Sequence, residues 1–278
     1  MTIEICRNRA VIPEHKVLLA LRYYATGSML VVCGNFIGVH KSTASRRVKL
    51  VSHVIATLRL QFIKFPDIEN NIKKLKQDFY NIAKFPMVIG AMDCTHIKIK
   101  SPGGDNAEAY RNRKGFFSIN VQTICDANLK IQDIVARWPG SSHDSTIFNN
   151  SEIRRKFEMG EMSNNLIVAD SDPTSGITAE AIDKYNESLI RTRNTVERSY
   201  GVWKRRFPVF ATGINVKVSS SQSIIVATAV IHNIACNFGE RLPRVTTEQE
   251  LSIKITDFNN AGDNISRNAV NSTRKTVN

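Results

Sequence analysis

The chain has 278 residues, of which 42% are hydrophobic, enough for one full core with an added module, and its formal charge is +13. Its five cysteines are scattered without a CxxC pair and no secretory signal is present, so we expect free thiols in an intracellular protein. No apolar run approaches the roughly 18 residues of a membrane span, since Arg22 interrupts the longest candidate, and the protein should be soluble.

The basic charge is concentrated in two stretches. Met1–Phe65 holds ten Lys or Arg against two Glu, and Lys184–Arg206 holds seven against two, so the rest of the chain is balanced. Such a local excess favours a polyanionic partner, and nucleic acid over a membrane surface because no basic amphipathic helix stands alone. General solubility is the alternative explanation.

The first elements along the chain are short helices. A proline and a glutamate at the start predict a helix from Pro13 to Ala25, and a second helix is predicted over about Met29–Ile37. A turn then leads into a third helix that includes Ser42–Val48. The spacing is that of a helix-turn-helix, in which Gly34 allows the helices to cross closely and Gly38 allows a positive φ.

This arrangement separates a buried face from a DNA-binding face. Val39, Ala44 and Val48 would face the core. The positions left to enter a major groove are His40, Lys41, Thr43, Ser45 and Arg46. A helical hairpin with a solvated basic face is the alternative, and the concentrated charge favours DNA. The Lys-rich helical spacing of Gln61–Phe85 predicts a linker helix behind the module.

A strand carrying an acid follows. Val88–Lys100 is apolar and β-branched, which predicts a strand near the middle of a sheet with Asp93 in the interior. A buried carboxylate needs a basic partner or a cation. The segments FSINVQTIC and LKIQDIVARW predict two more strands of an antiparallel meander. Asp144 then lies at a helix start beyond the sheet edge, where Ser141 or Ser142 could cap the helix.

Two elements complete the predicted domain. The run LIVAD is interpreted as a short buried strand that ends at Asp170. The helix Leu189–Phe207 has a core-facing side formed by Val196, Tyr200, Trp203 and Phe207. Glu197 lies at the border of that side and, taken alone, is typical of a solvated helix acid. A separate basic stripe on the same helix consists of Arg191, Arg198 and Arg205.

The three acids together form a pattern that phosphodiester cleavage uses: Asp93 on a first strand, Asp144 after a later strand and Glu197 on a following helix. Two divalent cations about 4 Å apart can activate water and stabilise the leaving oxygen, and Mg²⁺ or Mn²⁺ prefers carboxylate oxygen. Zinc is the competing metal because His96 and His143 are near in sequence. However, His96 points to the opposite face of the strand from Asp93, and no second His or Cys has ligand spacing.

Five stretches of the sequence carry a family resemblance: HKSTASRRV, GAMDCTHIKIK, YRNRKGFFSINVQ, PGSSHDSTIF and YNESLIRTRNTVERSYGVWKRRF. They span roughly Ala20 to Phe210 and resemble the transposases of PIF/Harbinger DNA transposons and the nucleases derived from them. The resemblance implies an α/β, ribonuclease H-like core, a mixed sheet flanked by helices, behind the all-α helix-turn-helix module. It also implies a DDE triad at Asp93, Asp144 and Glu197 that binds Mg²⁺ or Mn²⁺ and hydrolyses duplex DNA. A Myb-like or SANT-like DNA-binding partner protein and a location in the nucleus and cytoplasm are further expectations.

The chain also departs from the family pattern. Cys94 stands where the family usually has Gly, and Ala169–Pro173 stands where it has Gly-Asp-Ser-Gly-Tyr. The connection Asp170–Tyr185, which positions the Glu197 helix, is shorter than in the family. A catalytically inactive DNA-binding or scaffold protein is therefore the alternative to a nuclease.

The predicted organisation has four parts. A helix-turn-helix module occupies residues 1–65, a linker helix 66–85, the nuclease domain 86–241 and a polar, mobile tail 242–278. His232, on an apolar run, is interpreted as a hydrogen-bonded core histidine. Tyr110 and Lys114 are candidates either for DNA contact or for a loop satisfied by its own contacts.

Overall fold

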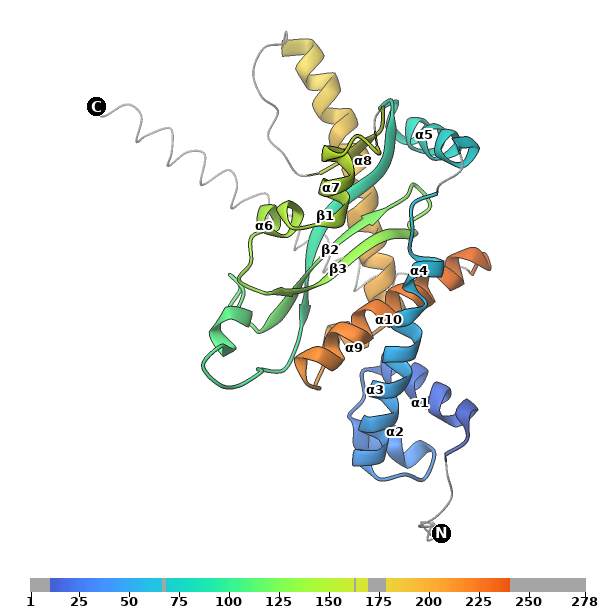
Figure 1. Ribbon diagram of the computed structural model, residues 1–278, viewed down its shortest axis with the longest axis vertical. Coiled ribbons are helices and arrows are strands. Elements are labelled where there is room, and N and C mark those ends of the chain that lie inside the picture. The colour runs from blue at the N-terminus through green and yellow to red at the C-terminus, as the bar shows by residue number, and fades with distance from the viewer. Residues whose placement is uncertain (1–10, 67–68, 163, 170–178, 241–278) are drawn as a thin grey trace, which may run out of the picture. The chain divides into compact units, whose positions relative to one another are not determined.

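A mixed four-stranded sheet lies at the centre of the structure, a computed structural model that describes residues 11–66, 69–162, 164–169 and 179–240 (Figure 1). The strands are β1 (Val88–Lys98), β2 (Ser118–Cys125), β3 (Ile131–Pro139) and β4 (Leu166–Val168). Their order is β3-β2-β1-β4, with antiparallel pairing from β1 to β3 and parallel pairing between β1 and β4. The predicted meander and the α/β class are confirmed, and the sheet is consistent with a ribonuclease H-like core.

β4 is an edge strand, and the prediction that it is buried is confirmed for Val168, which is 4% exposed, but was wrong for Leu166. It has three residues, and Leu166 at its start is 47% exposed. It pairs with β1 only from Val88 to Ala91, and its predicted end at Asp170 lies outside the described residues. Among the described residues, the pairing of β4 with β1 ends at Ala91, two residues before Asp93.

Helices cover both faces of the sheet. They are α5 (Glu69–Ala83), α6 (Asp144–Asn149), α7 (Glu152–Glu158), α8 (Ala179–Arg206), α9 (Val209–Thr212) and α10 (Val218–Asn237). Ala91 and Ile97 of β1 belong to the main core, which α5, α8 and α10 also line. Met92 belongs to a second cluster with Ile124 of β2 and Ile153 of α7. Because neighbouring side chains of a strand point to opposite faces, the two clusters lie on opposite sides of the sheet.

The core-facing side of α8 is confirmed. Its members are at most 8% exposed: Val196, Tyr200, Trp203 and Phe207. Trp203 is fully buried and packs edge-on against Phe210 of α9, with 4.9 Å between the ring centroids. The apolar spacing of the sequence therefore fixes how α8 is rotated against the sheet, and with it the direction of Glu197.

α10 is a core helix with the length and composition of a membrane span. The prediction that no segment reaches that length was wrong, since α10 does so in the described part of the chain, but most of it is buried in the protein. Arg206 donates to Nδ1 of the fully buried His232 at 2.9 Å, so Nε2 carries the proton and donates to the carbonyl of Leu129 at 2.8 Å. Burial lowers the pKa of His232 to about 4. The interpretation of His232 as a hydrogen-bonded core histidine is confirmed.

Four helices precede the sheet: α1 (Pro13–Thr26), α2 (Leu30–Phe36), α3 (Lys41–Thr57) and α4 (Arg59–Phe62). The predicted helix over Gln61–Phe85 is divided into α4 and α5. Gly34 of α2 and Gly38 of the α2–α3 turn behave as predicted. A Cβ on Gly34 would lie 2.5 Å from the carbonyl oxygen of Val39, and Gly38 has a φ of +69°. The assignment of this pair as a DNA-binding helix-turn-helix stays a prediction.

α3 packs against both α1 and α10. Ala44 and Val48 are buried as predicted, in the same core as Ile224 of α10. The hydroxyls of Tyr24 on α1 and Ser52 on α3 form a buried hydrogen bond of 2.6 Å. One apolar core thus continues from the N-terminal helices to the sheet. The division into modules 1–65, 66–85 and 86–241 stays a prediction, and the predicted tail lies outside the described residues.

Candidate active site

β1 and α8 together fix the position of Asp93. The hydroxyl of Tyr200 on α8 donates to the main-chain carbonyl of Asp93 and accepts a hydrogen bond from Thr123 of β2. The carboxylate oxygen Oδ1 accepts from the main-chain N–H of Cys94 at 2.8 Å. Within the described residues the carboxylate has no ion pair. The backbone is therefore held firmly while the acid is left open to a ligand.

Asp144 is held by β2. Nδ2 of Asn120 donates to Oδ1 of Asp144 at 2.8 Å and to the carbonyl of Ser142 at 3.0 Å, so the strand positions the loop that enters α6. Asp144 is the first residue of α6, as predicted. The predicted cap at Ser141 or Ser142 was wrong, because His143 is the N-cap residue and its side chain makes no capping hydrogen bond.

Asp93 and Asp144 line one cavity of about 530 Å³, which is called the acidic cavity below. Cys94 and Gln122 add polar atoms to it. The rest of the wall is Ser145 and a larger apolar part that consists of Met92, Phe148, Phe157, Leu166, Ile167 and Ala169. Two acids that are far apart in the sequence thus meet at one opening.

The two carboxylates of the acidic cavity repel each other. Burial raises the pKa of Asp93 to about 6, and the charges of Asp144 and Glu197 act in the same direction, while the Cys94 N–H and the charge of Arg193 act against it. Burial, followed by the charges of Asp144 and Asp93, raises the pKa of the Cys94 thiol, which therefore stays protonated. A cation in this cavity would relieve the repulsion between the carboxylates.

Glu197 does not line the acidic cavity. Its side chain is 52% exposed and pairs with Arg193, one turn earlier on α8, at 3.6 Å. Among the residues that the structure describes, no three His, Cys, Asp or Glu side chains are arranged to hold a metal ion. Asp93 and Asp144 form a partial set of hard oxygen ligands, which fits Mg²⁺ or Mn²⁺. The assignment of Asp93, Asp144 and Glu197 as a catalytic triad stays a prediction.

A second, polar cavity of about 490 Å³ shares Asp144 with the first. It is lined by His96 and His143 together with Arg113, whereas His96 does not line the acidic cavity. Burial lowers the pKa of His96, and its Nδ1 lies 3.1 Å from the hydroxyl of Ser118. The side chain of Tyr110 packs against the main core, which favours the structural interpretation of that residue.

Lys204 is a residue of this site that the sequence reasoning missed. Its ammonium donates to the hydroxyl of Thr95 on β1 at 2.6 Å. Burial and the nearby charge of Lys114 lower the pKa of Lys204 to about 8, whereas the charge of Asp93 acts to raise it. Lys204 follows Glu197 by seven residues, two turns of α8, so the helical spacing was the signal that could have identified it.

The residues predicted to contact DNA are accessible to different extents. His40, Lys41 and Arg46 of the α3 region are exposed, and Thr43 and Ser45 are half-buried. His40 also has a structural role, since its Nδ1 accepts from the main-chain N–H of Ser42 and caps α3.

The predicted basic stripe on α8 is uneven. Arg191 is exposed and pairs with Glu187 at 3.6 Å, Arg198 is exposed, and Arg205 is half-buried with its Nε enclosed. Arg198 is therefore the stripe member with the most accessible charge, because no described residue forms an ion pair with it.

Comparison with known proteins assigns this site to a family. Residues 92–233 match a family described as DDE superfamily endonuclease. The chain is 31% identical over 245 residues to the human protein named "Putative nuclease HARBI1", an alignment that covers 84% of this chain and 70% of that protein. The Xenopus laevis protein of that name is 29% identical over 241 residues, with 82% and 69% covered.

A more distant relative has a name without an enzymatic term. "Protein ALP1-like" of Arabidopsis thaliana is 27% identical over 150 residues, which cover 54% of this chain and 36% of that protein. No solved structure matches this chain. The matched family region begins at Met92 and ends at Asn233, so it includes Asp93, Asp144 and Glu197.

Proposed function

The chain belongs to the Harbinger transposase-derived family of DDE endonucleases, and from this membership we propose that it is a metal-dependent endonuclease acting on duplex DNA. The observation that carries the proposal is the acidic cavity, where Asp93 and Asp144 line one opening. Metal-free acids at such a site repel each other, which is the condition that a bound divalent cation removes.

Asp93 and Asp144 would hold the metal. Glu197 would become the third carboxylate ligand once its ion pair with Arg193 is broken. Mg²⁺ or Mn²⁺ at this place supplies Lewis-acid stabilisation of the phosphate and a more acidic water. Asn120 keeps the carboxylate of Asp144 oriented, and Tyr200 keeps the Asp93 backbone against α8. The protein's own contribution is thus to hold two carboxylates in place and to limit solvent on the apolar side of the cavity.

Metal binding should depend on pH. Because the pKa of Asp93 is raised to about 6, protons compete with the metal at mildly acidic pH. We expect the apparent affinity for Mn²⁺ to fall by up to about tenfold for each pH unit below 6 and to level off above it. Titration calorimetry between pH 5 and pH 8 measures this, and an affinity that is flat through this range would contradict the role of Asp93 as a ligand.

Lys204 supports a role for α8 in phosphate binding. We expect Lys204→Met to reduce cleavage about a hundredfold, since one charged donor near a reacting phosphate contributes on that scale. The lowered pKa of about 8 adds a more specific test. Wild-type cleavage should decline as the pH rises through about 8, because the ammonium loses its proton. Lys204→Arg should keep its activity to higher pH. If cleavage by this variant declines at the same pH as cleavage by the wild type, the assignment of Lys204 as a phosphate-binding residue is contradicted.

DNA would be held by two surfaces. The α3 face that begins at His40 would dock in a major groove, and the arginines of α8 would follow the backbone phosphates: Arg191, Arg198 and Arg205. A Myb-like or SANT-like protein remains the proposed partner. A DNA substrate also supports the expectation that the protein is present in the nucleus as well as in the cytoplasm.

A catalytically inactive DNA-binding or scaffold protein is the second candidate. The ion pair between Glu197 and Arg193 favours it, because the third acid is engaged within α8. Incubating the purified chain with supercoiled DNA and Mn²⁺ separates the two candidates. If the wild type nicks the DNA and Asp144→Asn does not, the result supports the nuclease. If both the wild type and Asp144→Asn bind the DNA without nicking it, the result supports the scaffold.

A further inference from the structure

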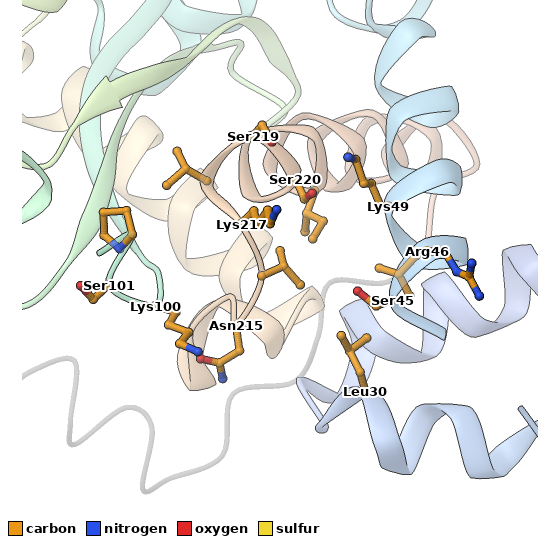
Figure 2. A pocket seen from close by; sticks show the side chains of 15 residues that line it. Leu30, Ser45, Arg46, Lys49, Lys100, Ser101, Asn215, Lys217, Ser219 and Ser220 are labelled. Carbon is orange, nitrogen blue, oxygen red and sulfur yellow. The ribbon is translucent and has the colours of Figure 1, made fainter. Parts of the chain in front are cut away.

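A basic cavity of about 750 Å³ lies between α3 and the start of α10, away from the acidic cavity (Figure 2). Its volume is in the range of ligand-binding cavities. Four parts of the chain line it: Leu30 at the start of α2, one side of α3, the segment Lys100–Pro102 after β1, and the segment from Asn215 into α10. Figure 2 shows Lys49 on α3 and Lys217 at the start of α10 on opposite sides of this space.

The lining has four basic side chains and no acidic one: Arg46, Lys49, Lys100 and Lys217. None of the four forms an ion pair or a side-chain hydrogen bond with another residue that the structure describes. Uncompensated like charges around one cavity raise its positive potential, and an anion placed between them lowers the energy. The charge of the lining therefore specifies an anionic ligand.

Hydroxyl and main-chain groups add to the basic side chains. Ser45 lines the cavity from α3, and Ser219 and Ser220 line it from the first turn of α10. Lys217 is the N-cap residue of this 20-residue helix and makes no side-chain capping bond. The first turn of a helix carries a partial positive charge, and since the N–H of Ser220 already donates to the carbonyl of Lys217, the N–H groups before Ser220 are the ones that face a ligand. Lysines, hydroxyls and N–H groups together match the oxygen atoms of a phosphodiester.

We propose that this basic cavity binds the backbone of the same DNA duplex whose major groove takes α3. Arg46 belongs both to the groove-facing residues of α3 and to the cavity lining, so a strand leaving the groove passes directly into the cavity. Lys49 contacts it from α3, Lys100 from the segment after β1, and Lys217 from the start of α10. The inference rests on the proposed function, because it takes duplex DNA as the ligand.

The salt dependence of DNA binding tests the cavity without cleavage. Fluorescence anisotropy with a short labelled duplex, in metal-free buffer over a salt series, measures the slope of log K against log salt for the full-length chain. Each lost lysine–phosphate contact should reduce this slope by about 1, so Lys217→Gln and Lys100→Gln should each lose about 1 and the double variant about 2. Lys217→Arg keeps the charge and should retain the wild-type slope.

Lys74→Gln is the matched control, because Lys74 is an exposed lysine of α5 that does not line the basic cavity. Its slope should equal that of the wild type, and thermal unfolding should show that all variants are folded. An unchanged slope in the double variant, or a reduction of the slope in Lys74→Gln equal to that of the cavity variants, would overturn the inference. The proposed function would remain intact in that case if the wild type still nicks DNA. A wild-type chain that binds no duplex would overturn both.

Discussion

Asp93→Asn should abolish DNA cleavage, with a loss of about a thousandfold or more, because the variant keeps the size of the side chain and removes its charge. The Cys94 N–H can still donate to the remaining carbonyl oxygen, and Tyr200 still holds the main chain, so the backbone at this position is preserved. Nicking of supercoiled DNA with Mn²⁺ measures the loss. Residual cleavage within tenfold of the wild type would contradict the proposed role of Asp93.

The same substitution should stabilise the metal-free protein. The pKa of Asp93 is raised by burial from 3.8 to about 6, so the native state carries a charge that it disfavours. The folded protein binds this proton more tightly than the unfolded chain, and stability is lost as the pH rises from about 4 to 6. In urea unfolding with EDTA, Asp93→Asn should gain up to about 3 kcal/mol at pH 8 and almost nothing near pH 4.

Asp105→Asn is the control for both measurements, because Asp105 is an exposed aspartate of the turn that follows Gly104. It should change neither cleavage nor the free energy of unfolding at any pH. A gain at pH 8 that persists at pH 4 would mean that the effect of Asp93→Asn does not come from its charge. A substitution that lowers activity and raises stability is what we expect at a functional site.

Asn233→Leu should lower the free energy of unfolding by about 3 kcal/mol or more, because it leaves several buried main-chain groups without partners. Asn233 is 3% exposed. Its Oδ1 accepts from the N–H of Ile131 at 2.8 Å, and its Nδ2 donates to the carbonyls of Ile131 at 2.6 Å and Phe62 at 2.8 Å. One side chain thus connects α10 to the start of β3 and to α4.

Asn237→Leu is the matched control for this change. Asn237 lies one turn later on α10 and is exposed, so the same substitution there removes no buried hydrogen bond. We expect it to change stability by less than about 0.5 kcal/mol. Urea unfolding of the two variants side by side measures the difference, and equal values would show that the polar contacts of Asn233 contribute little.

The sequence predicted those features that depend on local periodicity. The meander, the buried side of α8 and the roles of Gly34 and Gly38 all follow from patterns of a few residues, and the structure confirms them. The sequence could place Asp93 and Asp144 near each other because the predicted strand order restricts where each acid lies in the fold. The acidic cavity that they share was therefore within reach of the sequence.

Other features depend on tertiary contacts that local patterns do not contain. An apolar run such as LIV looks the same at the edge and in the middle of a sheet, so the exposure of Leu166 at the start of β4 was not expected. The burial of Lys204 follows from the depth at which α8 packs on β1. The basic cavity exists because α3 packs on α10, although these helices are far apart in the chain.

The continuous core between α1, α3, α10 and the sheet also determines how the protein loses its structure. Tyr24 of α1, whose hydroxyl contacts the buried Ser52 of α3, belongs to the same core as Trp203 of α8. Elements that share one core unfold cooperatively, in a single transition. A substitution in α1, far from Asp93 and Asp144, would therefore reduce the population in which those acids are assembled at all.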